Sequence, residues 1–278
     1  MAENSKIEWT HHTFNPWRGC TKVSAGCKHC YAETMSKRNP GTLGVWGKRG
    51  SRPVAVESYW KQPIKWNKDA KTAGERRRVF CASLADVFEG RDSMPESAWQ
   101  AVSGARIRLF NLIDATPDLD WLLLTKRPEN ILEMLGDWGV NTPANLWIGT
   151  SVENQEEADR RIPLLLTVPA KVRFLSCEPL LGPVDLRSYL HGIQWVIVGG
   201  ESGAGEDTRP MDPEWAQSLR DQCQFEQVAF HFKQWGEWYP MFLEQTDNGR
   251  HIATAFTRIG KAKAGRILDG RTWDELPA

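Results

Sequence analysis

Three of the six cysteines in this 278-residue chain lie within eleven positions, at Cys20, Cys27 and Cys30. They occupy the stretch NPWRGCTKVSAGCKHCYAE (15–33). Thiolates are nucleophiles and metal ligands, so a cluster of three indicates either redox chemistry or metal binding. A redox pair would use only Cys27 and Cys30, and Cys20 would then have no role.

A metal is therefore the stronger interpretation, and two kinds are open. Structural zinc needs four closed ligands, so the three thiolates would need a distant cysteine or one of His11, His12 and His29. A [4Fe–4S] cluster can be held by three thiolates, which leaves one iron open to an exogenous ligand. S-adenosylmethionine could chelate that iron, and one electron would cleave its S–C5′ bond to give a 5′-deoxyadenosyl radical.

The other cysteines have different surroundings. Cys223 recurs at helical spacing with Leu219, which predicts a core thiol. Cys81 and Cys177 lie at the ends of apolar runs, where a core role and a hydrogen-donor role in radical chemistry both stay open.

Short apolar runs must position these residues. From residue 79 a strand-like run, a polar turn and a helical segment recur; the runs are 79–83, 121–125, 146–151, 172–176, 195–200 and 228–232. Nearly continuous apolar character is typical of parallel strands covered on both faces. With a first strand around 13–18, the sequence predicts an α/β fold with a partial (βα)6-7 TIM-like barrel. A doubly wound open sheet is the competing topology.

Helix signals separate these runs. Ser93 and Glu96 have the spacing of a capping box, Pro128 suits a first helical position, and Asp212 precedes another helix at Pro213. Residues 39–78 are predicted to be an irregular insertion and 239–278 an irregular C-terminal extension. The whole chain, 1–278, is expected to form one domain.

Polar residues follow almost every apolar run. The carboxyl ends of parallel strands share one edge of a sheet, so these residues predict a functional site there. The candidates for holding S-adenosylmethionine are Ser151, Glu153, Asn154, Gly199, Gly200 and Glu201. The candidates for substrate contact and catalysis are Lys126, Arg127, Glu178, Lys233 and Gln234.

Several motifs together resemble a known family. The stretches NPWRGC…GCKHCYAE, LLLTKRPE, WIGTSVEN, FLSCEPLLGPVDL, WVIVGGESG and FKQWGEW are similar to those of a phage and bacterial three-cysteine-motif family. That family is radical S-adenosylmethionine-like and distantly similar to spore photoproduct lyase-like proteins. The resemblance implies a barrel of the radical S-adenosylmethionine type, with a [4Fe–4S] cluster on Cys20, Cys27 and Cys30.

The chain departs from the commonest radical-enzyme pattern in three respects. Its spacing is C-x6-C-x2-C instead of C-x3-C-x2-C, and His29 stands where an aromatic residue is usual. Its Gly-Gly-Glu (199–201) follows a late strand, whereas the corresponding motif normally follows the second.

Composition bears on the partners. Lys+Arg and Asp+Glu both number 35, which gives no electrostatic case for general binding to DNA or an anionic membrane. Separate basic clusters, interleaved with tryptophans at 17, 46, 60, 66, 235 and 238, could still line a path for nucleic acid. We expect a cytoplasmic protein that acts on a nucleic acid or nucleotide, with an electron donor such as flavodoxin or ferredoxin. A peptide or small metabolite stays open as the substrate, and the alternative function is a zinc-stabilised nucleic-acid-binding protein without catalysis.

Overall fold

The computed structural model describes residues 5–203, 205 and 207–277. Seven strands form one sheet in the order of the sequence, β1-β2-β3-β4-β5-β6-β7. The pairs β1–β2, β2–β3, β5–β6 and β6–β7 are parallel. The strands are β1 His12–Phe14, β2 Arg77–Cys81, β3 Leu119–Thr125, β4 Leu146–Ser151, β5 Val172–Cys177, β6 Trp195–Gly199 and β7 Ala229–Gln234. The predicted α/β class with parallel strands is confirmed.

Helices alternate with these strands along the chain. The α-helices are α1 Tyr31–Arg38, α2 Pro40–Leu43, α3 Glu57–Trp60, α4 Gln62–Ala73, α5 Glu96–Asp114, α6 Ile131–Leu135, α7 Gln155–Leu166, α8 Pro213–Phe225 and α9 Lys261–Ala264. The 3-10 turns are η1 Ala25–Cys27, η2 Arg91–Ser93, η3 Pro128–Asn130, η4 Gly136–Gly139 and η5 Leu190–Gly192. Among the helices of the described ranges, none is long and apolar enough to cross a membrane.

The chain divides into two compact units. The first comprises residues 1–23, 32–149 and 168–171, and the second comprises 24–31, 150–167 and 172–278. The cysteine loop therefore contributes Cys20 to the first unit, and Cys27 and Cys30 to the second. The expectation of a single domain stays a prediction.

In the first unit, β2 and β3 form an apolar layer. Val79 lies beside Trp121, and both side chains are fully buried. Helix α4 packs against both strands, and the side chain of Trp66 on this helix is 1% exposed. Burying such a large aromatic side chain stabilises the packing of the helix on the two strands.

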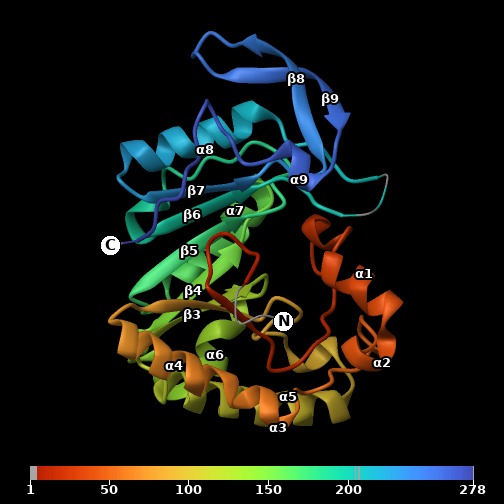
Figure 1. The fold of residues 1–278 in the computed structure, drawn as a ribbon, viewed down its shortest axis with the longest axis vertical. Helices are drawn as coiled ribbons and strands as arrows, with labels where there is room; N and C mark the ends of the chain where they lie inside the picture. Colours follow the sequence, from red (N-terminus) through yellow and green to blue (C-terminus); the bar gives the residue numbers. More distant parts are fainter. Residues whose placement is uncertain (1–4, 204, 206, 278) are drawn as a thin grey trace. The chain divides into compact units, whose positions relative to one another are not determined.

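In the second unit, β6 is the apolar centre, with all five residues buried. Trp195 pairs with Phe174 of β5 and with Ala229 of β7. Helix α8 begins at Pro213, where the Asp212 carboxylate caps it by accepting from the amide of Glu214 at 3.0 Å. It packs against β6, β7 and β9 (Figure 1).

Several predicted element boundaries were wrong. The segment 39–78 contains α2, α3 and α4, and the C-terminal extension contains an antiparallel hairpin of β8 Trp238–Gln245 and β9 His251–Arg258, so neither is irregular. The first strand ends at Phe14. Ser93 does not cap α5, because the helix begins after Pro95 without a side-chain cap. Pro128 does open a helical turn, as expected.

Candidate functional site

The cysteine loop connects β1 to α1, and its thiols differ from the other three. Cys20, Cys27 and Cys30 are free and half-buried, whereas Cys81, Cys177 and Cys223 are free and fully buried. Burial raises the pKa of each of the three core thiols, so they stay protonated and unreactive. The core position predicted for Cys223 is confirmed.

In the first unit, Arg127 organises the surroundings of Cys20. Its Nη1 donates to Sγ of Cys20 at 3.6 Å and to the Asp86 carboxylate at 2.9 Å, while its Nη2 donates to the carbonyl of Thr21 at 2.6 Å. Burial raises the pKa of the Cys20 thiol, and the carboxylates of Glu89 and Asp86 raise it further, against the opposing effect of Arg127. A thiolate at Cys20 therefore needs a compensating positive charge, such as a bound metal.

A second ion pair supports this group. Arg52 binds Glu89 through two hydrogen bonds of 2.8 Å, and both side chains are fully buried. Arg52 also donates to the Thr21 hydroxyl at 3.0 Å, and Arg127 lies 3.6 Å from Glu89. The sequence indicates Asp86 as a polar residue after the run at 79–83, but sequence reasoning missed Arg52 and Glu89 as parts of this group. The polar segment after β2 was the available signal for Glu89.

In the second unit, two predicted cosubstrate ligands are engaged with arginines. The Glu153 carboxylate accepts from Arg161 at 2.6 Å, and both side chains are fully buried. The Glu201 carboxylate accepts from Arg209, from Nε at 3.0 Å and from the backbone amide at 2.8 Å, with a further bond from Nη2. Each glutamate is thus neutralised by a residue eight positions later in the sequence.

Glu178, Lys233 and Gln234 come together at the ends of β5 and β7, as the sequence predicts for residues at this edge. Lys233 Nζ binds both Glu178 oxygens, at 2.6 and 2.8 Å, and Gln234 donates to Glu178 at 3.3 Å. Burial alone would raise the pKa of Glu178, but the Lys233 ammonium lowers it below its ordinary value. The Glu178 and Lys233 side chains are 19% and 12% exposed, so the pair is accessible to a ligand.

The remaining predicted residues have structural contacts. A Cβ on Gly199 would lie 3.4 Å from Glu178, and a Cβ on Gly200 would lie 1.9 Å from the carbonyl oxygen of Trp235. Gly200 is therefore required by close backbone packing. Asn154 caps α7 by accepting from the amide of Glu157 at 3.0 Å.

Ser151 and Lys126 also use backbone groups. Ser151 is buried and its carbonyl accepts from Arg161 at 2.8 Å, while the Lys126 amide donates to Asp86 at 3.2 Å. Lys126 and Arg127 lie in the first unit with Cys20. The candidates from Ser151 onward lie in the second unit with Cys27 and Cys30.

Two of the three histidines proposed as a fourth zinc ligand have other contacts, whereas the buried Nε2 of His29 has no hydrogen-bond partner among the described residues. His11 Nδ1 accepts from the amide of Arg78 at 2.8 Å, and His12 is buried and stacked on Trp66 with ring centroids 4.4 Å apart. Within the part of the chain that the structure describes, no three His, Cys, Asp or Glu side chains are arranged as a metal site. The donor chemistry suits an iron–sulfur cluster nonetheless, because the three loop thiols are free, half-buried and close in sequence.

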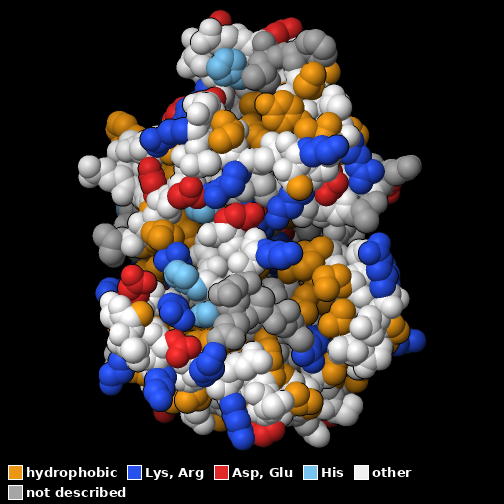
Figure 2. Space-filling view, in the orientation of Figure 1, with side chains coloured by type: hydrophobic (Ala, Val, Ile, Leu, Met, Phe, Trp, Pro, Cys, Tyr) orange, Lys and Arg blue, Asp and Glu red, His pale blue; other side chains and the backbone are white. Residues whose placement is uncertain are grey.

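The aromatic path expected for nucleic acid is largely wrong. Four of the six tryptophans are core residues, namely Trp17, Trp60, Trp66 and Trp235. Buried rings cannot stack on bases, which leaves the half-buried Trp46 and Trp238 as candidates. On the face seen in Figure 2, Lys and Arg side chains are interspersed with Asp and Glu, in keeping with the zero net charge.

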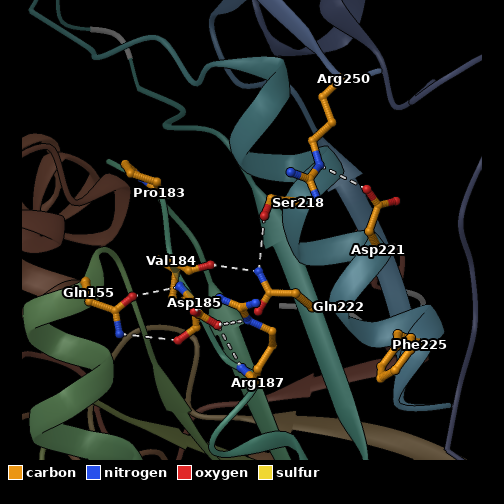
Figure 3. A pocket seen from close by; sticks show the side chains of 10 residues that line it. All are labelled: Gln155, Pro183, Val184, Asp185, Arg187, Ser218, Asp221, Gln222, Phe225 and Arg250. Carbon is orange, nitrogen blue, oxygen red and sulfur yellow. Dashed lines mark hydrogen bonds and ion pairs between the residues drawn. The ribbon is translucent and has the colours of Figure 1, made fainter. Parts of the chain in front are cut away.

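A pocket of about 560 Å³ in the second unit contains none of the predicted residues (Figure 3). Its polar groups bind one another: Gln222 donates to the Val184 carbonyl at 3.1 Å, Gln155 accepts from the Asp185 amide at 2.7 Å, and Arg250 pairs with Asp221 at 3.0 Å. These bonds connect loop, helix and hairpin, so the pocket is better explained by packing than by ligand recognition.

Comparison with known proteins identifies one family. Its model, described as a protein of unknown function (DUF5131), matches residues 4–277. No curated protein and no solved structure matches the chain. Because the family match extends over nearly the whole sequence, the chain belongs to the DUF5131 family.

Proposed function

We propose that this protein is a radical S-adenosylmethionine enzyme whose [4Fe–4S] cluster is held by Cys20, Cys27 and Cys30. The observation that carries the proposal is the division of the thiols: the three on the β1–α1 loop are half-buried, and the other three are fully buried. A loop after the first strand is where the resemblance to radical enzymes expects the cluster. Seven strands in sequence order suit a partial barrel of that type.

The bound cluster would supply one-electron reductive cleavage of S-adenosylmethionine. The protein's own residues would supply the surroundings. Arg127 places a positive charge beside Cys20, which would stabilise a coordinated thiolate.

Glu178, Lys233 and Gln234 are the best-supported substrate contacts. The three together present a carboxylate, an ammonium and an amide, and the side-chain Oε1 of Gln234 is buried without a hydrogen-bond partner among the described residues. Carboxylate and amide groups match the donor and acceptor edges of nucleobases. We therefore propose a nucleobase, within a nucleotide or a nucleic acid, as the substrate, and an electron donor such as flavodoxin or ferredoxin as the partner.

Anaerobic purification tests the proposal. We expect a brown protein that contains iron and sulfide and has an absorption band at about 400 nm, as [4Fe–4S] proteins show. Adding S-adenosylmethionine and a strong reductant should yield 5′-deoxyadenosine. A colourless protein with one zinc would instead support a zinc-stabilised nucleic-acid-binding protein without catalysis.

A further inference from the structure

The turn that ends at Cys27 lies directly against the Glu153 carboxylate. The Ser24 hydroxyl donates to Glu153 Oε1 at 2.7 Å, and Ser24 Oγ lies 3.9 Å from Sγ of Cys27. A Cβ on Gly26 would lie 2.4 Å from the same Glu153 oxygen. Only glycine therefore lets the turn approach the carboxylate this closely.

A second contact holds the same turn. Arg209 Nη2 donates to the Ala25 carbonyl at 3.0 Å, while Glu201 fixes the orientation of that guanidinium. The turn is thus bound by a carboxylate at Ser24 and by a guanidinium at Ala25. Both contacts lie within the second unit.

Both anchors are attached to the sheet. Glu153 follows the end of β4, and Arg161 holds it while also donating to the carbonyl of Ser151, the last residue of that strand. Glu201 follows β6, and its side chain is only 3% exposed. Buried, charge-assisted hydrogen bonds are geometrically specific, so these groups can hold a loop in one position.

We infer that Glu153 and Glu201 are positioning residues that anchor the Ser24–Cys27 turn and thereby place Cys27 as a cluster ligand. This inference rests on the proposed function, and it replaces the expectation that the two glutamates bind S-adenosylmethionine. Glu153 acts directly on Ser24, and Glu201 acts through Arg209.

The apo-protein offers a test that needs no cluster. The turn is closed by hydrogen bonds from the amide of Cys27 to the Ser24 carbonyl at 3.0 Å and from the amide of Lys28 to the Ala25 carbonyl at 3.2 Å. We expect Gly26→Ala and Arg209→Met each to accelerate exchange of these two amides by about tenfold, because the added methyl forces the turn away from the Glu153 carboxylate and the loss of the guanidinium frees the Ala25 carbonyl. NMR on the millisecond timescale measures the exchange. Both variants should also bind less iron on reconstitution.

Glu157→Gln is the matched control. Glu157 lies 3.1 Å from the same Arg161, but among the described residues its carboxylate pairs with arginines of α7 and not with the turn, so exchange and iron content should stay at wild-type levels. A double variant isolates the contact itself. In a Glu153→Ala background the methyl of Gly26→Ala meets no carboxylate, so adding it should cause little further acceleration.

Three outcomes overturn the inference. These are unchanged amide exchange in Gly26→Ala and Arg209→Met, equal effects of Gly26→Ala in both backgrounds, and normal iron content despite a loosened turn. A wild-type protein that binds no iron overturns the proposed function instead. In that case the exchange data still decide whether the two anchors hold the turn.

Discussion

Arg127 Nη1 lies 3.6 Å from Sγ of Cys20 and 2.9 Å from the Asp86 carboxylate, so one guanidinium nitrogen joins the first cysteine of the loop to a buried acid. Arg127 is 4% exposed, which makes it unsuited to the substrate contact expected from the sequence. Its position instead suits control of the proposed cluster, since hydrogen bonds to the sulfurs help set the reduction potential.

Replacing Arg127 by lysine should therefore shift the potential without removing the cluster. Lysine keeps a positive charge near Asp86 but cannot reproduce the planar set of donors. We expect a potential lower by about 60 mV, a tenfold change in a one-electron equilibrium. A redox titration followed by EPR measures it, with the exposed Arg91→Lys as the control. Equal potentials in the two variants would contradict this role.

The cysteines themselves should separate into two groups. Cys20→Ala, Cys27→Ala and Cys30→Ala should each lose most of the iron, because two thiolates do not hold a cluster stably. Cys223→Ala should keep its iron and lose only about 1 kcal/mol of unfolding free energy from packing. Iron analysis and chemical denaturation distinguish the groups. Equal iron loss in all four variants would remove the basis for the assignment.

The Glu178–Lys233 pair should show strong coupling. Either Glu178→Gln or Lys233→Met leaves a largely buried charge without its partner and should cost about 3 kcal/mol of unfolding free energy. The double variant should cost less than the sum of the two, by about 1–3 kcal/mol. Denaturant titrations of the apo-protein measure this, with the exposed Arg91–Glu96 pair as the control. Additive effects would show that the contact contributes nothing.

His231 should make stability depend on pH in mildly acidic solution. Burial, together with the charge of Arg266, lowers the pKa of His231 from 6.5 to about 4. Between these values the unfolded state binds the proton and the folded state does not, so stability is complete above pH 6.5 and falls as the pH drops toward 4. The loss from this residue approaches about 3 kcal/mol.

His231→Phe removes the titrating group and keeps a ring of similar size. The variant should lose stability less steeply than wild type between pH 6.5 and 4, as measured by the unfolding free energy at each pH. The exposed His191→Phe should follow the wild-type curve. Parallel curves for His231→Phe and wild type would show that another group causes the dependence.

Nucleic-acid binding should depend on salt and on Lys126. Each Lys–phosphate contact adds about one unit to the slope of log affinity against log salt. We expect Lys126→Gln to lower this slope for single-stranded DNA or RNA, and Lys68→Gln, on the exposed face of α4, to leave it unchanged. An absence of binding at low salt would exclude a nucleic-acid polymer and leave free nucleotides to be tested.

The sequence predicted strands better than it predicted contacts. β4 begins and ends where its apolar run does, because a strand buried on both faces leaves a continuous hydrophobic signature. Helix α4 was missed because Lys65, Lys68 and Lys71 obscure a buried face formed by Trp66 and Ala70. The β8–β9 hairpin was missed too, although Asp247-Asn248-Gly249 between its strands is a turn signal.

In the candidate site, too, the positions of residues could be predicted from the sequence but their contacts could not. The positions of Glu153 and Glu201 after strands were predictable, whereas their neutralisation by Arg161 and Arg209 was not. Both arginines lie eight residues further on, but neither pair shares one helix or strand, so each contact forms only through a turn of the chain. Arg52 was not identified because it lies in a segment without hydrophobic periodicity.

Because Cys81, Cys177 and Cys223 are buried, their reaction with a thiol reagent shows whether the protein is folded. A thiol reagent applied briefly to the native apo-protein should modify Cys27 and Cys30, because burial keeps Cys20 protonated and the three core thiols react only in molecules that have opened. A folded variant without a cluster therefore gains mass at the loop thiols alone, and an unfolded variant gains it at every cysteine that it retains. Every substitution described above can be sorted in this way from a single sample, without a spectroscopic signal or a known substrate.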